Sequence, residues 1–165
     1  MKGKTNSMRV LDSHSVAYQA HEFSAEVRSA DEAASAMGVP IQQVYKTLVV
    51  LRERGRPLLV MLAGGSVLDL KQLARASGDK KLHMASRHEA EELTGLEVGG
   101  ISALALLNKG FDTYADESLL ALPRVYVSAG VRGMNLSLKP ADLVEVTRAR
   151  LASVAGPLPE DGESK

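Results

Sequence analysis

Runs of apolar residues separated by glycine, proline and charged turns give this chain the pattern of a protein with several β-strands. The longest run covers residues 43–51, and a second covers residues 57–62. The turn signal Arg54-Gly55-Arg56 lies between them, which predicts a β-hairpin. Further runs predict strands at residues 16–23, 81–84, 111–115, 124–128 and 134–138.

Helix start and stop signals occur between these strands. Ser29, Asp69 and Ser86 stand where an N-cap side chain is needed, and each segment that follows ends at a glycine. Ser86 is also followed three positions later by Glu89, which is the pattern of a capping box. The predicted helices are residues 31–37, 70–77, 87–94, a short one at 117–122 and a last one that begins at Pro140.

Helices and strands alternate along the chain, but the hairpin excludes a purely parallel sheet. We therefore expect a single α+β domain, with one mixed sheet covered by helices. The ends of the chain are polar or rich in glycine and proline. They predict a flexible lead over residues 1–8 and a disordered tail over residues 154–165, which leaves residues 9–153 as the domain.

The composition fits one globular domain with a core of its own. The chain has 165 residues, of which 45% are apolar and 24% charged. Its basic and acidic residues balance to a formal net charge of zero. A broad electrostatic field for capturing nucleic acid is therefore not expected, and any contact with nucleic acid should be local.

Several classes of protein can be set aside. There are no cysteines, which excludes disulfides, thiolate nucleophiles and cysteine metal sites. No signal peptide is evident, and the apolar runs are too short to cross a bilayer, so we expect a cytoplasmic protein. No metal site and no cofactor are predicted, because the histidines lack zinc-ligand spacing. These are His14, His21, His83 and His88.

Lys46 is the first candidate for chemistry, because it interrupts the apolar run 43–51. An ionised lysine is costly to bury without a partner, so a charge here suggests a site for an anion or a polarised carbonyl. The alternative is that the stem of Lys46 lies on the core while its ammonium reaches water. Considered alone, this segment favours the alternative.

Two glycine-bearing segments are the other candidates. Gly99-Gly100-Ile101-Ser102 follows a predicted helix end, where exposed amides could hold a carbonyl or phosphate oxygen. A helix cap followed by a tight turn would give the same residues. The segment 128–133, between two predicted strands, is equally well explained as a hairpin loop.

Taken in order, these segments and their neighbours resemble the YbaK family. Its members are free-standing aminoacyl-tRNA editing proteins related to the insertion domain of bacterial prolyl-tRNA synthetase. The match spans roughly residues 10–150. It is carried by Gln43 to Leu48, Leu68 to Ala74, Leu93 to Gly95, Val98 to Ser102 and Tyr126 to Gly130, with Arg132-Gly133 just after.

The resemblance implies a twisted, mixed and partly barrel-like sheet flanked by helices. It also implies hydrolysis of the ester that joins a wrong amino acid to the 3′-terminal adenosine of a tRNA. The most similar members by motif are Cys-tRNA(Pro) deacylases, and other members remove alanine. The implied catalytic residues are Lys46, Gly100 and Ile101, and the implied substrate-binding residues are Phe23, Tyr45, Thr47, Gly99, Ser102, Ser128, Gly130 and Asn135.

The chain departs from the family pattern at four positions. Ala103 stands where the family usually has proline, and Ala105 where it usually has glycine. Asn135 replaces a frequent aspartate, and Phe23 falls on a tyrosine position. A loop without that proline is less stiff, because proline fixes φ. These departures bear on which amino acid is removed and on how fast.

Three functions are therefore compared. The first is an editing hydrolase that acts in trans on mischarged tRNA such as Cys-tRNA(Pro) or Ala-tRNA(Pro). The second is a non-catalytic module of the same fold that binds aminoacyl-tRNA or a synthetase. The third is a hydrolase of small esters. For the first, the expected partners are the tRNA acceptor end and prolyl-tRNA synthetase, because a chain of zero net charge should bind free tRNA weakly.

Overall fold

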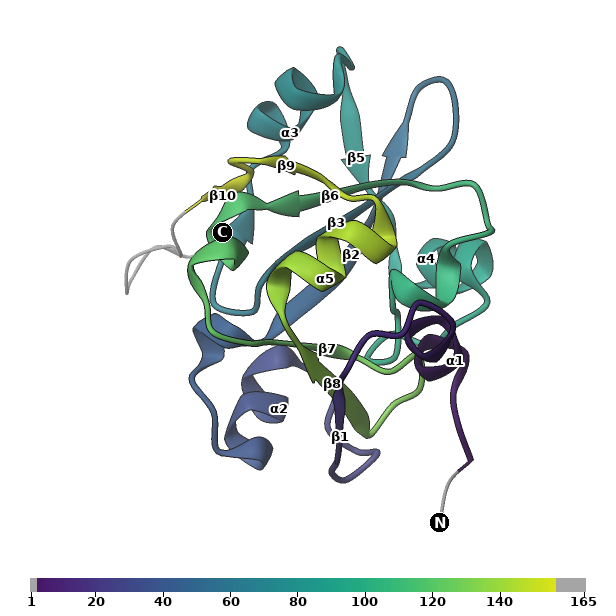
Figure 1. The fold of residues 1–165 in the computed structure, drawn as a ribbon. Helices are drawn as coiled ribbons and strands as arrows, with labels where there is room; N and C mark the ends of the chain where they lie inside the picture. The colour runs from purple at the N-terminus through teal and green to yellow at the C-terminus, as the bar shows by residue number, and fades with distance from the viewer. Residues whose placement is uncertain (1–2, 157–165) are drawn as a thin grey trace.

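A computed structural model describes residues 3–156 (Figure 1). Its helices are α1 (Asn6–Ser13), α2 (Ala30–Met37), α3 (Leu70–Ser77), α4 (Arg87–Thr94) and α5 (Pro140–Thr147), with short 3-10 turns η1 (Ile41–Gln43), η2 (Leu104–Leu106) and η3 (Glu117–Ala121). Its strands are β1 (Gln19–Glu22), β2 (Tyr45–Arg52), β3 (Leu58–Ala63), β4 (Val67–Leu68), β5 (Leu82–Met84), β6 (Asp112–Asp116), β7 (Val125–Ser128), β8 (Met134–Leu138), β9 (Arg150–Ala152) and β10 (Ala155–Gly156).

The strands of residues 3–156 form a mixed five-stranded sheet, a separate three-stranded antiparallel sheet and a small two-stranded sheet of β10 and β4. The first has the order β5-β2-β3-β6-β9, in which β2 is antiparallel to both neighbours while β3, β6 and β9 are parallel. The second has the order β1-β8-β7. A single parallel bridge between Val44 and Tyr126 joins β7 to the start of β2. The sheets therefore curl toward one another, but over residues 3–156 they do not close into a barrel, which agrees with the α+β class expected.

The main core lies between the two sheets. It gathers apolar side chains from α1, β2, β3, η2, β6, β7, β8 and α5. α5 crosses the middle of the molecule in Figure 1 and contributes Leu143, which is fully buried. A smaller cluster, which includes Val50, Val60 and Leu73, packs the other face of the five-stranded sheet against α3. Successive residues of β2 thus serve both cores, because side chains alternate along a strand.

The capping signals read from the sequence are confirmed. Ser29 accepts a hydrogen bond from the Glu32 amide, and Ser86 and Glu89 form the reciprocal capping box. Asp69 caps α3. The glycines that follow α2, α3 and α4 all adopt the left-handed conformation, which a residue without Cβ enters at little cost.

Both predicted ends of the domain need correction. The lead predicted over residues 1–8 is wrong for residues 6–8, which lie in α1 behind the N-cap Thr5, with Ser7 and Met8 buried. The tail predicted over residues 154–165 is wrong for residues 154–156. Val154 is fully buried, and β10 pairs with β4. Residues 1–2 and 157–165 lie outside the described part of the chain.

Asp116 explains why the C-terminal segment is ordered. Its carboxylate accepts hydrogen bonds from the amides of Val154 and Ala155 at 2.9 and 3.1 Å, and from the amide and hydroxyl of Ser118. Burial raises the pKa of Asp116, but these hydrogen bonds outweigh burial and lower it. A contact between residues 116 and 154 leaves no signature in the local pattern of a sequence.

Candidate functional site

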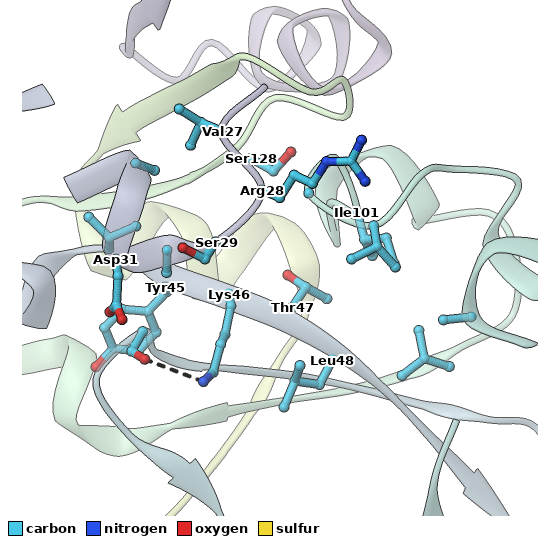
Figure 2. Close-up of a pocket in the computed structure, with 18 of the residues that line it drawn as sticks. Val27, Arg28, Ser29, Asp31, Tyr45, Lys46, Thr47, Leu48, Ile101 and Ser128 are labelled. Atoms are coloured by element: carbon cyan, nitrogen blue, oxygen red, sulfur yellow. Dashed lines mark hydrogen bonds between the residues drawn. The ribbon is translucent and has the colours of Figure 1, made fainter. Parts of the chain in front are cut away.

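A cavity of about 480 Å³ opens between α2, β2, α4 and the loop after α4. β2 lines it with five consecutive residues, 45–49, and Gly99 and Ile101 line it from the loop after α4. Figure 2 shows Thr47, Ile101 and Ser128 on one side of β2, with Lys46 and Leu48 pointing to the other. Of the eleven site residues predicted from the sequence, those that line it are Phe23, Tyr45, Lys46, Thr47, Gly99, Ile101, Ser128 and Asn135.

Lys46 is half-buried and its ammonium is held by main-chain oxygens. Its Nζ donates to the carbonyl of Ser66 at 2.9 Å and to that of Gly64 at 3.3 Å, both in the turn that follows β3. An ammonium has three N–H donors, so one remains. Burial lowers the pKa of Lys46, and the charge of Asp31 on α2 opposes that shift. Lys46 is therefore not a side chain that simply snorkels into water.

Tyr45 contributes to the cavity without offering it a hydroxyl. Its Oη lies 2.5 Å from Ser118 Oγ, which in turn donates to Asp116. The Tyr45 side chain is 3% exposed. Tyr45 therefore fixes β2 against η3, and the hydrogen-bond chain through Ser118 reaches the C-terminal segment held by Asp116.

The glycine loop does not act as the sequence suggested. The Gly100 amide donates to the Glu97 carbonyl at 2.8 Å, so it is not free to donate to a substrate. A Cβ on Gly100 would lie 2.9 Å from backbone atoms of Val131 and Arg132, which identifies Gly100 as a packing glycine. The Ile101 amide, in contrast, has no hydrogen-bond acceptor among residues 3–156.

Ser102 and Gly130 lie behind the cavity rather than in its lining. Ser102 is 2% exposed, and its Oγ lies 2.9 Å from Ser7 Oγ on α1. A Cβ on Gly130 would approach the same Ser7 Oγ at 3.2 Å. α1, which the sequence did not predict, thus packs against the loop that carries Ser102 and the loop that carries Gly130, on their side away from the cavity. Direct substrate contacts by Ser102 and Gly130 are not consistent with this placement.

Ser128 and Asn135 bring polar groups from neighbouring strands into the cavity. They are direct partners in the pairing of β7 with β8. The Ser128 hydroxyl accepts a hydrogen bond from the Gly130 amide at 3.1 Å. The side chain of Asn135 makes no hydrogen bond with the described residues, so its amide is available to a ligand.

Two arginines at the rim were missed in the sequence. Arg28 precedes the N-cap of α2 and Arg87 follows the N-cap of α4, and both line the cavity with exposed side chains. Figure 2 places the Arg28 guanidinium on the side of Ile101. A helix N-terminus disfavours cations, so a basic residue next to a cap was the signal that could have identified each of them.

Arg132 connects two segments that border the cavity. Its Nη2 donates to the carbonyl of Ala25, and its Nη1 lies 3.4 Å from a Glu97 carboxylate oxygen. It therefore joins the segment between β1 and α2 to the loop that carries Gly99. Its Nε is buried without a hydrogen-bond partner in the described structure, which shows how tightly these loops pack.

Comparison with known proteins agrees with this geometry. The family model described as "Aminoacyl-tRNA editing domain" matches residues 24–146. A protein of Enterococcus faecalis named "Putative Cys-tRNA(Pro)/Cys-tRNA(Cys) deacylase EbsC" is 36% identical over 153 residues, which are 92% of this chain and 93% of that protein. A proline–tRNA ligase of Thermodesulfovibrio yellowstonii is 35% identical over 77 residues, which are 47% of this chain and 13% of the ligase.

A solved structure supports the same assignment. The crystal structure of "a putative trans-editing enzyme for prolyl tRNA synthetase" superposes with a TM-score of 0.77 at 30% identity, covering 94% of this chain and 99% of that one. No helix formed by residues 3–156 is long and apolar enough to span a membrane. The chain belongs to the aminoacyl-tRNA editing domain family.

Proposed function

We propose that this protein hydrolyses the ester of mischarged aminoacyl-tRNA in trans, with Cys-tRNA(Pro) and Ala-tRNA(Pro) as the first substrates to test. The observation that carries the proposal is the cavity itself. It is lined by the half-buried Lys46 of β2 and by Ile101 of the loop after α4, whose amide has no hydrogen-bond acceptor among residues 3–156. Its volume is in the range of sites that hold small ligands, which suits an amino acid on a terminal adenosine.

The donors in the cavity suit an ester that gains negative charge. The remaining N–H of Lys46 and the amide of Ile101 can donate to oxygens of the ester and of the terminal ribose. Such donors act strongly where water is excluded, and loss of one typically costs on the order of 100-fold or more in rate. Asn135 and Ser128 supply further polar contacts from β7 and β8.

The attacking group is proposed to be water or a group of the substrate. The serine and threonine side chains of the cavity lining are Ser29, Thr47, Ser86 and Ser128. No histidine lines the described cavity, so the histidine that commonly activates a serine nucleophile is missing from this lining. A substrate hydroxyl or thiol held beside the ester would take that role.

The partners follow from charge. Since the net charge is zero, tRNA should be held chiefly by its acceptor end, where Arg28 and Arg87 offer cations to the terminal phosphates. Tight capture would then need a second protein, for which prolyl-tRNA synthetase is the candidate. This proposal places the protein in the cytoplasm, where aminoacyl-tRNA is made and used.

A deacylation assay with purified protein tests the proposal. Cys-tRNA(Pro), Ala-tRNA(Pro) and correctly charged Pro-tRNA(Pro) would be compared for wild type, Lys46→Met and the control Lys109→Met, which removes an exposed lysine outside the cavity lining. We expect hydrolysis of a mischarged tRNA, lost by at least about 100-fold in Lys46→Met and retained in the control. Hydrolysis of none of a wider panel of mischarged tRNAs would exclude the proposal.

A non-catalytic binding module is the second candidate, and the Gly100 amide favours it, because that predicted donor is already used within the loop. This alternative predicts that the protein binds aminoacyl-tRNA or the synthetase and slows spontaneous deacylation. The same assay distinguishes the two functions, since wild type would then protect the ester rather than cleave it.

A further inference from the structure

The cavity lies against the edge of β2 rather than against one of its faces. Five consecutive residues, Tyr45 to Val49, line it. Successive side chains of a strand point to opposite faces, so one face could supply only every second residue. A lining of five in a row arises where a cavity runs along the strand edge, and Figure 2 shows side chains leaving β2 in both directions there.

The pairing of β2 identifies the peptide groups on this edge. On the β3 side, the Val44 carbonyl accepts from the Gly64 amide at 2.7 Å. On the other side, the Val49 carbonyl accepts from the Ala85 amide at 3.0 Å. Peptide groups in an antiparallel ladder alternate between the two neighbours. The N–H and C=O of Thr47 therefore face the same side as those of Val49.

On that side Thr47 has no partner strand among residues 3–156. β5 pairs with β2 only from Val50 onward, and the bridge to β7 involves only Val44. The edge between them faces the cavity, where Thr47 is half-buried. Buried main-chain donors and acceptors are nearly always paired, so a donor and an acceptor left open in a cavity mark a place for a ligand.

We propose that the aminoacyl group of the substrate binds here as a single residue of an added strand. Its α-ammonium donates to the Thr47 carbonyl, and its ester carbonyl accepts from the Thr47 amide. An α-aminoacyl ester carries this donor and acceptor at the spacing of one strand residue, which is how strand edges bind peptides. The inference rests on the proposed function and adds to it the group that orients the amino acid.

This arrangement separates two tasks. The main chain of Thr47 reads groups that every amino acid carries, so it cannot tell one side chain from another. Selection by size is then left to the residues around the amino-acid side chain. An amine that is acylated or missing should be discriminated against strongly, because the Thr47 carbonyl would lose its donor.

Replacing a single amide by an ester tests the inference. The 2-hydroxy acid analogue of threonine at position 47 removes the Thr47 N–H and keeps the side chain. The matched control is the same exchange at Val50, whose N–H faces β3 and which does not line the cavity. The ligands are alanyl and cysteinyl amides of 3′-amino-3′-deoxyadenosine, which cannot be hydrolysed, and their propionyl counterpart, which lacks the amine.

We expect the ester at position 47 to raise the Kd for both aminoacyl ligands about 10-fold, at nearly unchanged melting temperature. The control should lower the melting temperature and leave the Kd within about two-fold. Removing the amine should weaken binding to wild type at least about 10-fold. Equal Kd values for the position-47 ester and wild type, equal binding with and without the amine, or no binding by wild type would each overturn the inference.

Failure of this inference can be told apart from failure of the proposed function, because the ligand assay requires no turnover. Hydrolysis of mischarged tRNA at equal rates by wild type and the position-47 ester would refute the strand-edge contact alone. Tight, amine-dependent binding without hydrolysis would support the contact and refute the hydrolase.

Discussion

Two adjacent glycines give a sharp test of how the site is packed. A Cβ built on Gly64 would lie 2.4 Å from Ala30 Cβ, and 3.3 Å from both Ile41 Cγ1 and the Val44 carbonyl oxygen. A Cβ on Gly65 would meet nothing closer than Ile41 Cγ2 at 3.6 Å, which is ordinary contact. Neither glycine has a positive φ, so space alone separates the two positions.

The cost of Gly64→Ala follows from that distance. Carbon atoms pack best at about 3.5–4.0 Å, so Ala30 must move by about 1 Å or more. Such overpacking typically costs about 1–3 kcal/mol. In a domain of this size, that corresponds to a fall of roughly 2–12 °C in melting temperature. Gly65→Ala should be neutral or stabilise by up to about 1 kcal/mol, because it restricts the unfolded chain.

Activity should fall together with stability, because Ala30 begins α2 beside Arg28 and Asp31 at the cavity. Urea unfolding and deacylation rates of Gly64→Ala, Gly65→Ala and the double variant Gly64→Ala/Ala30→Gly would be compared. The double variant removes the clashing Cβ, so it should recover part of both losses. Equal stability of the two single variants, or no recovery in the double variant, would refute the packing argument.

Three further predictions concern charge. Burial lowers the pKa of Lys46, so wild type should gain stability relative to Lys46→Met as the pH rises through the folded-state pKa toward the ordinary lysine value. A difference in urea midpoint that does not change over this pH range would contradict this. Burial raises the pKa of Asp116, but hydrogen bonds, that of Ser118 first, lower it overall, so Asp116→Asn should cost about 1.5–3 kcal/mol of unfolding free energy at neutral pH. In urea titrations the difference between wild type and variant should narrow below about pH 4, and a difference that stays constant with pH would refute the role of the charge. Arg28→Gln and Arg87→Gln should each lower kcat/KM on mischarged tRNA in low salt. Near 1 M salt, where charges are screened within about 3 Å, their kcat/KM should approach that of wild type, and a loss that does not depend on salt would contradict contact with phosphate.

Local signals explain what could be predicted from the sequence. The β2–β3 hairpin and the capped helices depend on residues within a few positions of each other, and they were predicted correctly. α1 was missed because only Ser7, Met8 and Leu11 of its side chains are buried, and its hydrogen bond from Ser7 to Ser102 joins residues far apart in the sequence. Strand β10 was missed because it depends on the buried Asp116 carboxylate.

The candidate site shows the same division. The position of Lys46 within a strand is a local property, but its two carbonyl partners, Gly64 and Ser66, lie about 20 residues away in the turn that follows β3. Gly100 was expected to offer its amide to a substrate, but in the structure that amide donates to the Glu97 carbonyl. A glycine pattern cannot show whether a nearby carbonyl, here that of Glu97, already uses the amide. The open edge at Thr47 depends on where two other strands stop pairing, which no local pattern encodes.

The pairing of β1 with β8 has a consequence during synthesis of the protein. Gln19 pairs with Ser137, and the segment that carries Phe23 and Arg28 follows β1 directly, so its position depends on this pairing. Ribosomes extend a chain by about 5–20 residues per second, so β1 must wait on the order of ten seconds for its partner. Until then the wall of the cavity formed by residues 23–29 cannot be in place. A nascent chain should therefore be unable to bind aminoacyl-tRNA until β8 has left the ribosome and paired with β1.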